Sequence, residues 1–266
     1  MTRTSTGAGE PSRTLALLWE DIPTGDTQTA RRRKGPGRSV TVSQVVDAAL
    51  SLADEEGLAA VTMRAVAERV GVSAMSVYTY VPGKAELLDL MVDALYRRMP
   101  RPAWRSRSWR RRLTTVADGN RTLLAEHPWL TEVAALSRPP LGPGVMGKYE
   151  HELAAFDGTG LSDVDTDAAL THLLGFVQAH ARAAHDAARA TTDSAMSDAD
   201  WWAANQPLLE RALDPQTYPR AVRIGAAAGE AQGGAWNAEH AWEFGLARTL
   251  DGLAPLIEDR TAKGRR

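Results

Sequence analysis

The amino-acid sequence predicts an all-helical protein with a small N-terminal head and a larger C-terminal body. From about Ser108 onward, no stretch alternates polar and apolar residues with the period of two expected of a strand, whereas Ala and Leu recur at spacings of three and four. Helix-capping residues and Gly or Pro stops divide the chain into segments of helical length. A chain of 266 residues is also long enough to form two packed units.

The first 40 residues have the least regular pattern, and we expect them to form a flexible extension. Within them, residues 15–19 (LALLW) are apolar and predict one short helix docked on the body. A basic run follows, made of Arg31, Arg32, Arg33, Lys34 and Arg38. Such a run is most often a solvated tail.

The first helix of the head is predicted to begin at Thr41, which can form a capping box with Gln44, and to end at Gly57. Residues 62–88 then have the pattern of two short helices joined by a tight turn. Thr62 and Ser73 are suitable N-caps, and Gly71 ends the first of the two helices.

The second short helix spans little more than two turns, because Pro82 and Gly83 stop it. Its inward residues are predicted to be Val77 and Val81. That leaves an outward set near the helix start, namely Ala74, Met75, Ser76 and Thr79. In a helix-turn-helix, these positions face base edges in the major groove. We therefore expect a DNA-binding domain at residues 41–98.

The charge distribution agrees with this expectation. Residues 31–112 contain 16 Lys and Arg against 8 Asp and Glu, while the rest of the chain contains 15 against 25. The basic part is the part with the helix-turn-helix pattern, and cations there would neutralise DNA phosphates. The basic run at residues 31–38 directly precedes the first head helix, so it is also a candidate arm for the minor groove.

Three sequence blocks identify the head more closely. A leading helix ends in Asp54-Glu55-Glu56-Gly57, the pattern T-x-R-x-V-A-x-x-V-G-V begins at Thr62, and Y-x-Y-V-x-x-K-x-x-L-L begins at Tyr78. In this order and spacing, they resemble the tetracycline repressor (TetR) family of bacterial regulators from about Thr41 to Asp93. The resemblance implies phosphate contacts by Ser73, Tyr78, Tyr80 and Lys84, and base contacts by Arg64, Ala74, Met75, Ser76 and Thr79.

A helix opened by Gly83 and Lys84 is predicted to connect the head to the body at residues 99–266. The body helices are expected at residues 108–126, 129–136, 143–156, 162–191 and 198–213, with a last helix capped by Asn237. Two of these helices, at 162–191 and after 237, carry apolar stripes that are wider than the core of one subunit needs. The resemblance implies that this pair forms a four-helix bundle with a second copy, giving a homodimer; a core within one chain is the alternative.

The resemblance continues into the body with weaker motifs, among them Ser108-Trp109, Ser137-Arg138-Pro139 and Lys148-Tyr149-Glu150. It implies a ligand pocket, and together with the polar and aromatic residues nearby it selects Val116, Asn120, Trp129, Ala134, Ser137, Glu150, Thr171, Leu174 and Gln178. Tetracycline repressors have a magnesium-binding histidine where this chain has Ala134, so a metal-chelated tetracycline is not expected. The remaining residue types suit an uncharged or cationic, polycyclic or amphipathic molecule.

Several kinds of site are not expected. His172 and His180 lie about 12 Å apart along one helix, too far to share a metal ion. The chain has no cysteine, no nucleophile-elbow motif and no phosphate-binding loop, so we expect neither an enzyme nor a cofactor. It also has no apolar run of membrane-spanning length and no signal-peptide core, which predicts a soluble cytoplasmic protein.

Together, these observations predict a homodimeric repressor that binds a pseudo-palindromic DNA operator and is released by a small-molecule inducer. An activator or architectural DNA-binding protein that recruits a protein partner instead is the alternative. A ligand-modifying enzyme with a remnant DNA-binding head is a further alternative, which the missing catalytic motifs disfavour.

Overall fold

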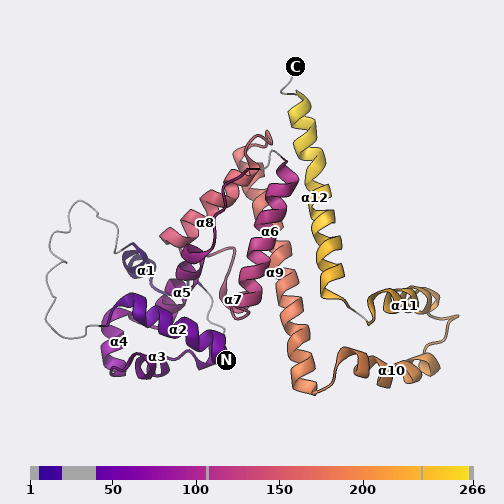
Figure 1. The fold of residues 1–266 in the computed structure, drawn as a ribbon, viewed down its shortest axis with the longest axis horizontal. Coiled ribbons are helices and arrows are strands. Elements are labelled where there is room, and N and C mark those ends of the chain that lie inside the picture. The colour runs from indigo at the N-terminus through magenta and orange to yellow at the C-terminus, as the bar shows by residue number, and fades with distance from the viewer. Residues whose placement is uncertain (1–5, 20–39, 106–107, 235, 264–266) are drawn as a thin grey trace.

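The computed structural model describes residues 6–19, 40–105, 108–234 and 236–263, and within these ranges it contains helices and no strand (Figure 1). The predicted all-helical fold is therefore confirmed for this part of the chain. The head lies at one end, a connecting helix leaves it, and the body helices pack beyond that helix. None of the described helices combines the length and the apolar character needed to cross a membrane.

Residues 6–19 are part of the packed structure. Helix α1 (Pro11–Leu18) begins at Glu10, whose carboxylate accepts hydrogen bonds from the backbone N–H groups of Ser12 and Arg13. Leu18 is buried, and α1 packs against the connecting helix. We expected the whole extension to be flexible, but this segment forms the docked short helix that the apolar patch predicts. The basic run at residues 31–38 lies outside the described residues.

The head consists of three helices with the predicted caps. Helix α2 (Val42–Glu56) has the complete capping box between Thr41 and Gln44. After the short 3₁₀ helix η1 (Leu58–Ala60), α3 (Met63–Val70) begins at Thr62 and ends at Gly71, whose φ of 79° lies in the left-handed region that favours glycine. Helix α4 (Ala74–Tyr80) follows after only three residues. The connecting helix α5 (Lys84–Arg98) then carries the chain out of the head.

The body is made of helices of very different lengths. Its elements are α6 (Trp109–Glu126), α7 (Leu130–Val133), α8 (Pro143–Leu153), η2 (Ala154–Phe156), α9 (Asp163–Ser194), α10 (Asp198–Ala212), α11 (Pro219–Gln232) and α12 (Ala238–Lys263). The helix predicted at residues 129–136 is a single turn, followed by an irregular loop up to α8. Helix α11 was not predicted, because its many Gly and Ala residues obscure the helical pattern.

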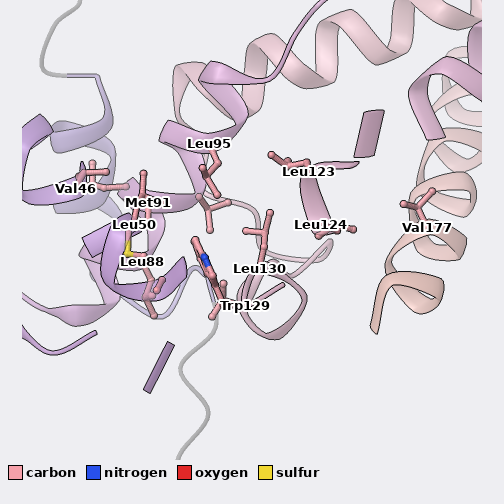
Figure 2. Close-up of a cluster of buried hydrophobic side chains, with 14 of the residues drawn as sticks. Val46, Leu50, Leu88, Met91, Leu95, Leu123, Leu124, Trp129, Leu130 and Val177 are labelled. Atoms are coloured by element: carbon pink, nitrogen blue, oxygen red, sulfur yellow. The ribbon is translucent and has the colours of Figure 1, made fainter. Parts of the chain in front are cut away.

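One hydrophobic core extends from the head into the body (Figure 2). Leu88, Met91 and Leu95 on α5 belong to the same buried cluster as Val46 and Leu50 on α2. On the body side, this cluster continues through side chains of α6, α7 and α9, among them Leu123, Leu124, Leu130 and Val177. Because α5 contributes to both parts of the core, a movement of the body that displaces α5 must also change the packing of side chains in the head.

The apolar stripe of α12 has a different role from the one we expected. Leu246 and Leu250 are buried within the subunit, in the same core cluster as residues of α6 and α9. The prediction that this stripe exceeds the needs of the subunit's own core was therefore wrong. The apolar stripe predicted on residues 162–191 is also not buried along the whole helix, since Ala188 in the second half of α9 is exposed.

Helices α10 and α11 extend away from the rest of the body (Figure 1). Neither contains a buried residue. The exposed apolar side chains on these helices are Trp201, Leu208, Leu209 and Ile224, and Tyr218 directly before α11 is exposed as well. Helices of this length without a buried face have little stability of their own in water.

Candidate DNA interface and ligand cavity

The short helix α4 presents a defined outer surface because its inner side is anchored. Val77 and Val81 are completely buried, as predicted, and they fix the rotation of the helix against the head. Ser73 caps the helix by accepting a hydrogen bond from the N–H of Ser76 at 3.2 Å. As a result, Met75 is 75% exposed and Tyr78 is 47% exposed. The outer surface of α4 is therefore accessible to a macromolecule.

Arg64 on α3 is available for a new contact. Its Nε lies 2.9 Å from Oε1 of Glu68, one turn further along the helix, and both side chains are largely exposed. An exposed ion pair of this kind contributes at most about 1 kcal/mol. DNA phosphates or a guanine edge can therefore compete with Glu68 for the guanidinium group.

Lys84 lies at the start of α5, and its ammonium group is partly sheltered. Nζ lies 3.5 Å from the carbonyl oxygen of Leu58, and burial lowers the pKa of the Lys84 ammonium. Tyr80 is half-buried against the head core. These two side chains are thus held by the head itself, which suits groups that position a protein on a phosphate backbone.

The body contains a cavity of about 310 Å³, a volume at the lower end of the range for small-molecule sites. It lies among α5, α8 and α9 and is closed on one side by the loop between α7 and α8. Of the predicted ligand-binding residues, Ala134, Thr171, Leu174 and Gln178 line it. Asn120 lines a smaller space of about 30 Å³, which shares Leu174 and Gln178 with the larger cavity.

The cavity floor holds a buried ion pair. Nζ of Lys148 lies 2.7 Å from Oε2 of Glu152, and the amide of Asn120 donates to Oε1 of Glu152 at 2.6 Å. The ring of Tyr96 lies below Lys148, with its centroid 5.1 Å from Nζ. Burial raises the pKa of the Tyr96 phenol far above its usual value, so this group stays neutral.

Near the α9 side of the cavity, the hydroxyl group of Tyr149 donates a hydrogen bond of 2.7 Å to Oδ1 of Asp167. This bond, aided by the carboxylate charge, raises the pKa of Tyr149. The charged residues among the cavity-lining set are Lys148, Glu152 and Asp167. Two carboxylates therefore accompany one ammonium group, and the cavity carries an excess of negative charge.

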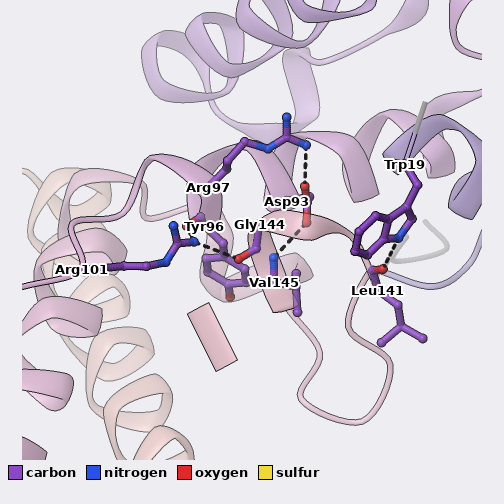
Figure 3. Close-up of polar contacts among 8 residues, drawn as sticks. All are labelled: Trp19, Asp93, Tyr96, Arg97, Arg101, Leu141, Gly144 and Val145. Atoms are coloured by element: carbon purple, nitrogen blue, oxygen red, sulfur yellow. Dashed lines mark hydrogen bonds and ion pairs between the residues drawn. The ribbon is translucent and has the colours of Figure 1, made fainter. Parts of the chain in front are cut away.

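The cavity wall is bonded directly to the connecting helix (Figure 3). The carboxylate of Asp93 on α5 accepts a hydrogen bond from the backbone N–H of Val145 on α8 at 2.9 Å. Arg101 donates to the carbonyl oxygen of Gly144 at 3.3 Å and to that of Tyr96 at 3.0 Å. The first turn of α8, which lines the cavity, and the helix leaving the head are thus held together.

Comparison with known proteins identifies the architecture. Residues 45–91 match the family model described as bacterial regulatory proteins, tetR family. Residues 101–257 match the model of the tetracyclin repressor-like C-terminal domain. The chain is 39% identical to the HTH-type transcriptional repressor DrrR1 of Streptomyces coeruleorubidus over 258 residues, which are 96% of this chain and 90% of the relative.

The chain belongs to the TetR family of transcriptional regulators. As a TetR-family regulator, it is a helix-turn-helix protein and not an enzyme. It is also 26% identical over 245 residues, 87% of each chain, to the HTH-type transcriptional repressor Rv1353c of Mycobacterium tuberculosis. Among solved structures, the Streptomyces coelicolor TetR family protein ActR in complex with (S)-DNPA matches with a TM-score of 0.65 and 25% identity, covering 81% of this chain and 98% of ActR.

Four of the predicted ligand-binding residues line neither the cavity nor the smaller space beside it. Val116 is buried on α6, and Trp129 is buried where its Nε1 donates to Asp54 of the head at 2.7 Å. Ser137 and Glu150 are exposed. The prediction that these four residues lie at the pocket is therefore not supported by their positions.

The helical register of α8 explains the difference at Glu150. Lys148 and Glu152 are four residues apart and share the inward face, so Glu150 between them points away. Sequence reasoning missed both inward residues, together with Tyr96, Tyr149 and Asp167. The spacing of Lys148 and Glu152 was the available signal, but an exposed i, i+4 pair has the same spacing.

The described residues contain no group of three His, Asp or Glu side chains placed to hold a metal ion.

Proposed function

We propose that this TetR-family protein is a homodimeric transcriptional repressor that is released from its operator by a small molecule bound in the body. The observation that carries the proposal is the hydrogen bond from Val145 to Asp93, because it joins the cavity wall to the helix that leaves the DNA-binding head. A ligand that displaces the first turn of α8 would displace α5 as well. The ligand needs only a higher affinity for the released state.

In the proposed DNA complex, α4 enters the major groove. Ser73, Tyr78, Tyr80 and Lys84 hold phosphates, while Arg64, Ala74, Met75, Ser76 and Thr79 face bases. The exposed positions of Met75, Tyr78 and Arg64 support this assignment. The apolar side chains of Ala74 and Met75 are suited to thymine methyl groups. The basic residues at 31–38 are proposed to form the accompanying arm.

The proposed ligand has an apolar body and one cationic group. The apolar wall comes from side chains such as Leu136, Leu170 and Leu174, and the excess carboxylate charge favours a cation near Asp167 or Glu152. Two similar proteins support the proposal of a ligand-responsive repressor: DrrR1 is a transcriptional repressor, and ActR binds the small molecule (S)-DNPA.

We propose that exposed apolar side chains on α10, α11 and α12 form the dimer interface. Phe244 and Leu256 on α12 are 58% and 51% exposed, and α10 and α11 present further large apolar residues. In the proposed dimer, a second copy of the chain covers these exposed apolar side chains. Two copies would provide the two heads that successive major grooves require.

The proposal is tested first on DNA. A duplex recovered by repeated selection from random-sequence DNA should bind tightly, and its consensus should be pseudo-palindromic. Lys84→Ala should weaken binding to the selected duplex and to random DNA alike, and should lower the slope of log affinity against log salt by about one unit. Loss of sequence preference without a change in salt slope would contradict the phosphate role of Lys84.

The second test concerns the cavity. Ala134→Trp should fill it, leaving the affinity for the selected duplex intact while abolishing release by those cationic and polycyclic compounds that release the wild-type protein. Ser137→Trp is the matched control, since Ser137 is exposed and does not line the cavity. If no compound from a broad panel releases the DNA, the activator or architectural alternative is favoured.

A further inference from the structure

The N-terminal segment at residues 6–19, here called the N-terminal strap, contacts both the ligand cavity and the connecting helix. It precedes the DNA-binding head in sequence, yet it lies against α5 and the loop between α7 and α8. Leu18 anchors it in the core. The strap therefore links the loop that lines the cavity to the helix that leaves the head.

The two ends of the strap hold the two ends of the cavity-closing loop. Thr6 lines the cavity and is 1% exposed; its N–H donates to the carbonyl oxygen of Val133 at 3.0 Å, and its Oγ1 accepts from the N–H of Ala135 at 3.2 Å. At the other end, Nε1 of Trp19 donates to the carbonyl oxygen of Leu141 at 2.8 Å (Figure 3). Ala135 and Leu141 both line the cavity.

Between these ends, the strap is bonded to the first two turns of α5. The N–H of Gly7 donates to Oδ1 of Asp89 at 2.9 Å, and the N–H of Glu10 donates to Oε1 of Glu86 at 3.2 Å. The other oxygen of Glu86 packs against Gly83, where an added Cβ would lie 2.9 Å from it. Gly83 is the N-cap of α5 and follows α4 by only three residues. The strap thus reaches the joint between α4 and the connecting helix.

We propose that the N-terminal strap couples occupancy of the cavity to the position of the recognition helix α4. A molecule that pushes the loop at residues 134–141 outward pulls on Thr6 and Trp19. The strap then shifts against Asp89 and Glu86, which belong to the helix that begins next to α4. This inference rests on the proposed ligand-released repressor, and it assigns to residues 6–19 a part of the release mechanism that is separate from the contact between α8 and α5.

The test uses a covalent occupant of defined structure, because the chain contains no cysteine. Thr171 lines the cavity and is solvent-exposed, so Thr171→Cys can be alkylated at a single site with N-phenylmaleimide. The affinity for the selected duplex is measured before and after alkylation. In this parent variant, alkylation should weaken DNA binding by roughly 5- to 150-fold, the usual range of coupling between two sites.

The strap is then altered in the same background. Thr6→Val keeps the size of the side chain but removes the acceptor for Ala135, while Thr6→Ser keeps the acceptor and is the matched control. Trp19→Phe removes the donor to Leu141 and is the second test at the opposite end. The weakening caused by alkylation should shrink to less than about threefold in Thr6→Val and in Trp19→Phe, and should persist in Thr6→Ser.

Hydrogen exchange provides an independent readout. Alkylation of the parent should accelerate amide exchange at Gly7, whose N–H donates to Asp89 on α5, and at Ala135, whose N–H donates to Thr6 of the strap. Equal weakening of DNA binding by alkylation in all four proteins would overturn the role of the strap and leave the proposed function standing. If alkylation weakens DNA binding in none of them, including the parent, the ligand-released function fails and the coupling role fails with it.

Discussion

Asp93 and Val145 join the helix that leaves the head to the helix that lines the cavity, through a hydrogen bond of 2.9 Å from the backbone N–H of Val145 to the carboxylate of Asp93. The side chain of Asp93 is almost fully buried, and its second oxygen accepts a hydrogen bond from Arg97 at 3.2 Å. The two helices are very close here, because a Cβ added to Gly144 would lie 2.0 Å from the carbonyl oxygen of Asp93. Only glycine permits this approach.

The contact between α5 and α8 should be essential for stability. Asp93→Ala leaves the buried N–H of Val145 without its acceptor, which should cost about 1 to 3 kcal/mol in the free energy of unfolding. Asp93→Asn retains an acceptor oxygen at this position and is the control. Urea denaturation measures both variants, and an unchanged midpoint for Asp93→Ala would show that the hydrogen bond contributes nothing.

Gly144→Ala tests the close approach itself. The added methyl group must push α8 away from α5, and overpacking of this kind costs about 1 to 3 kcal/mol or more. Gly158→Ala is not a suitable comparison, because its φ of 76° introduces backbone strain. Gly175→Ala is a better control, since it lies within α9 and has open space around its Cβ position. Thermal melting should show a lower Tm for Gly144→Ala and no decrease for Gly175→Ala.

The stability that the ion pair on the cavity floor contributes should depend on both Lys148 and Glu152. Lys148→Met leaves the carboxylate of Glu152 buried without its cation, which should cost about 3 to 5 kcal/mol. The double variant Lys148→Met with Glu152→Leu removes both charges and should recover most of this loss. Chemical denaturation of the two single variants and the double variant gives the coupling energy. A double variant less stable than either single variant would contradict this account.

Association through α12 can be tested without disturbing the core. Phe244→Glu combined with Leu256→Glu places charges on exposed positions, so the chain should keep its helical circular dichroism while sedimentation shows a monomer. Leu250→Glu, in contrast, should unfold the subunit, because Leu250 is only 5% exposed and an unpaired buried charge costs several kcal/mol. A folded dimer of the Phe244 and Leu256 double variant would exclude this surface as the interface.

His180 should make stability depend on pH. Its ring packs against Trp242, with centroids 5.1 Å apart, and burial, followed by the charge of Arg121, lowers the pKa of the imidazole. Because the folded pKa lies below the unfolded value of about 6.5, the unfolded chain binds the proton first as the pH falls. The stability contributed by neutral His180 is therefore fully present above the unfolded pKa. It is lost as the pH falls from the unfolded pKa toward the folded pKa. His180→Phe should flatten the dependence of Tm on pH between about 8 and 5.

The helices of the head could be predicted residue by residue because their signals are local. Thr41 with Gln44, Thr62 and Ser73 cap their helices as predicted, and Val77 and Val81 face inward. The same holds for Ser162 and Asn237 in the body, whose side chains accept hydrogen bonds from backbone N–H groups at the starts of α9 and α12. Each signal needs only the three or four residues that follow it.

The cavity could be predicted only in part. Ala134, Thr171, Leu174 and Gln178 line it, but Ser137 and Glu150 do not. Resemblance to a family gives the position of a residue along the chain. The lining of a cavity depends in addition on the rotation of α8 and on the path of an irregular loop. Both are set by packing against α5, including the unusual approach at Gly144.

The sequence by itself determined the class of the protein, the DNA-binding head and the start of most helices, because caps, turns and apolar spacing act over a few residues. Only the tertiary structure decided the roles of residues whose partners are distant in the chain. Leu246 and Leu250 are used within the subunit, Lys148 pairs with Glu152 beneath a cavity, and Thr6 lies beside Ala135 across 129 positions of sequence. Long-range contacts of this kind depend on how whole helices pack, and no local pattern in one sequence specifies them.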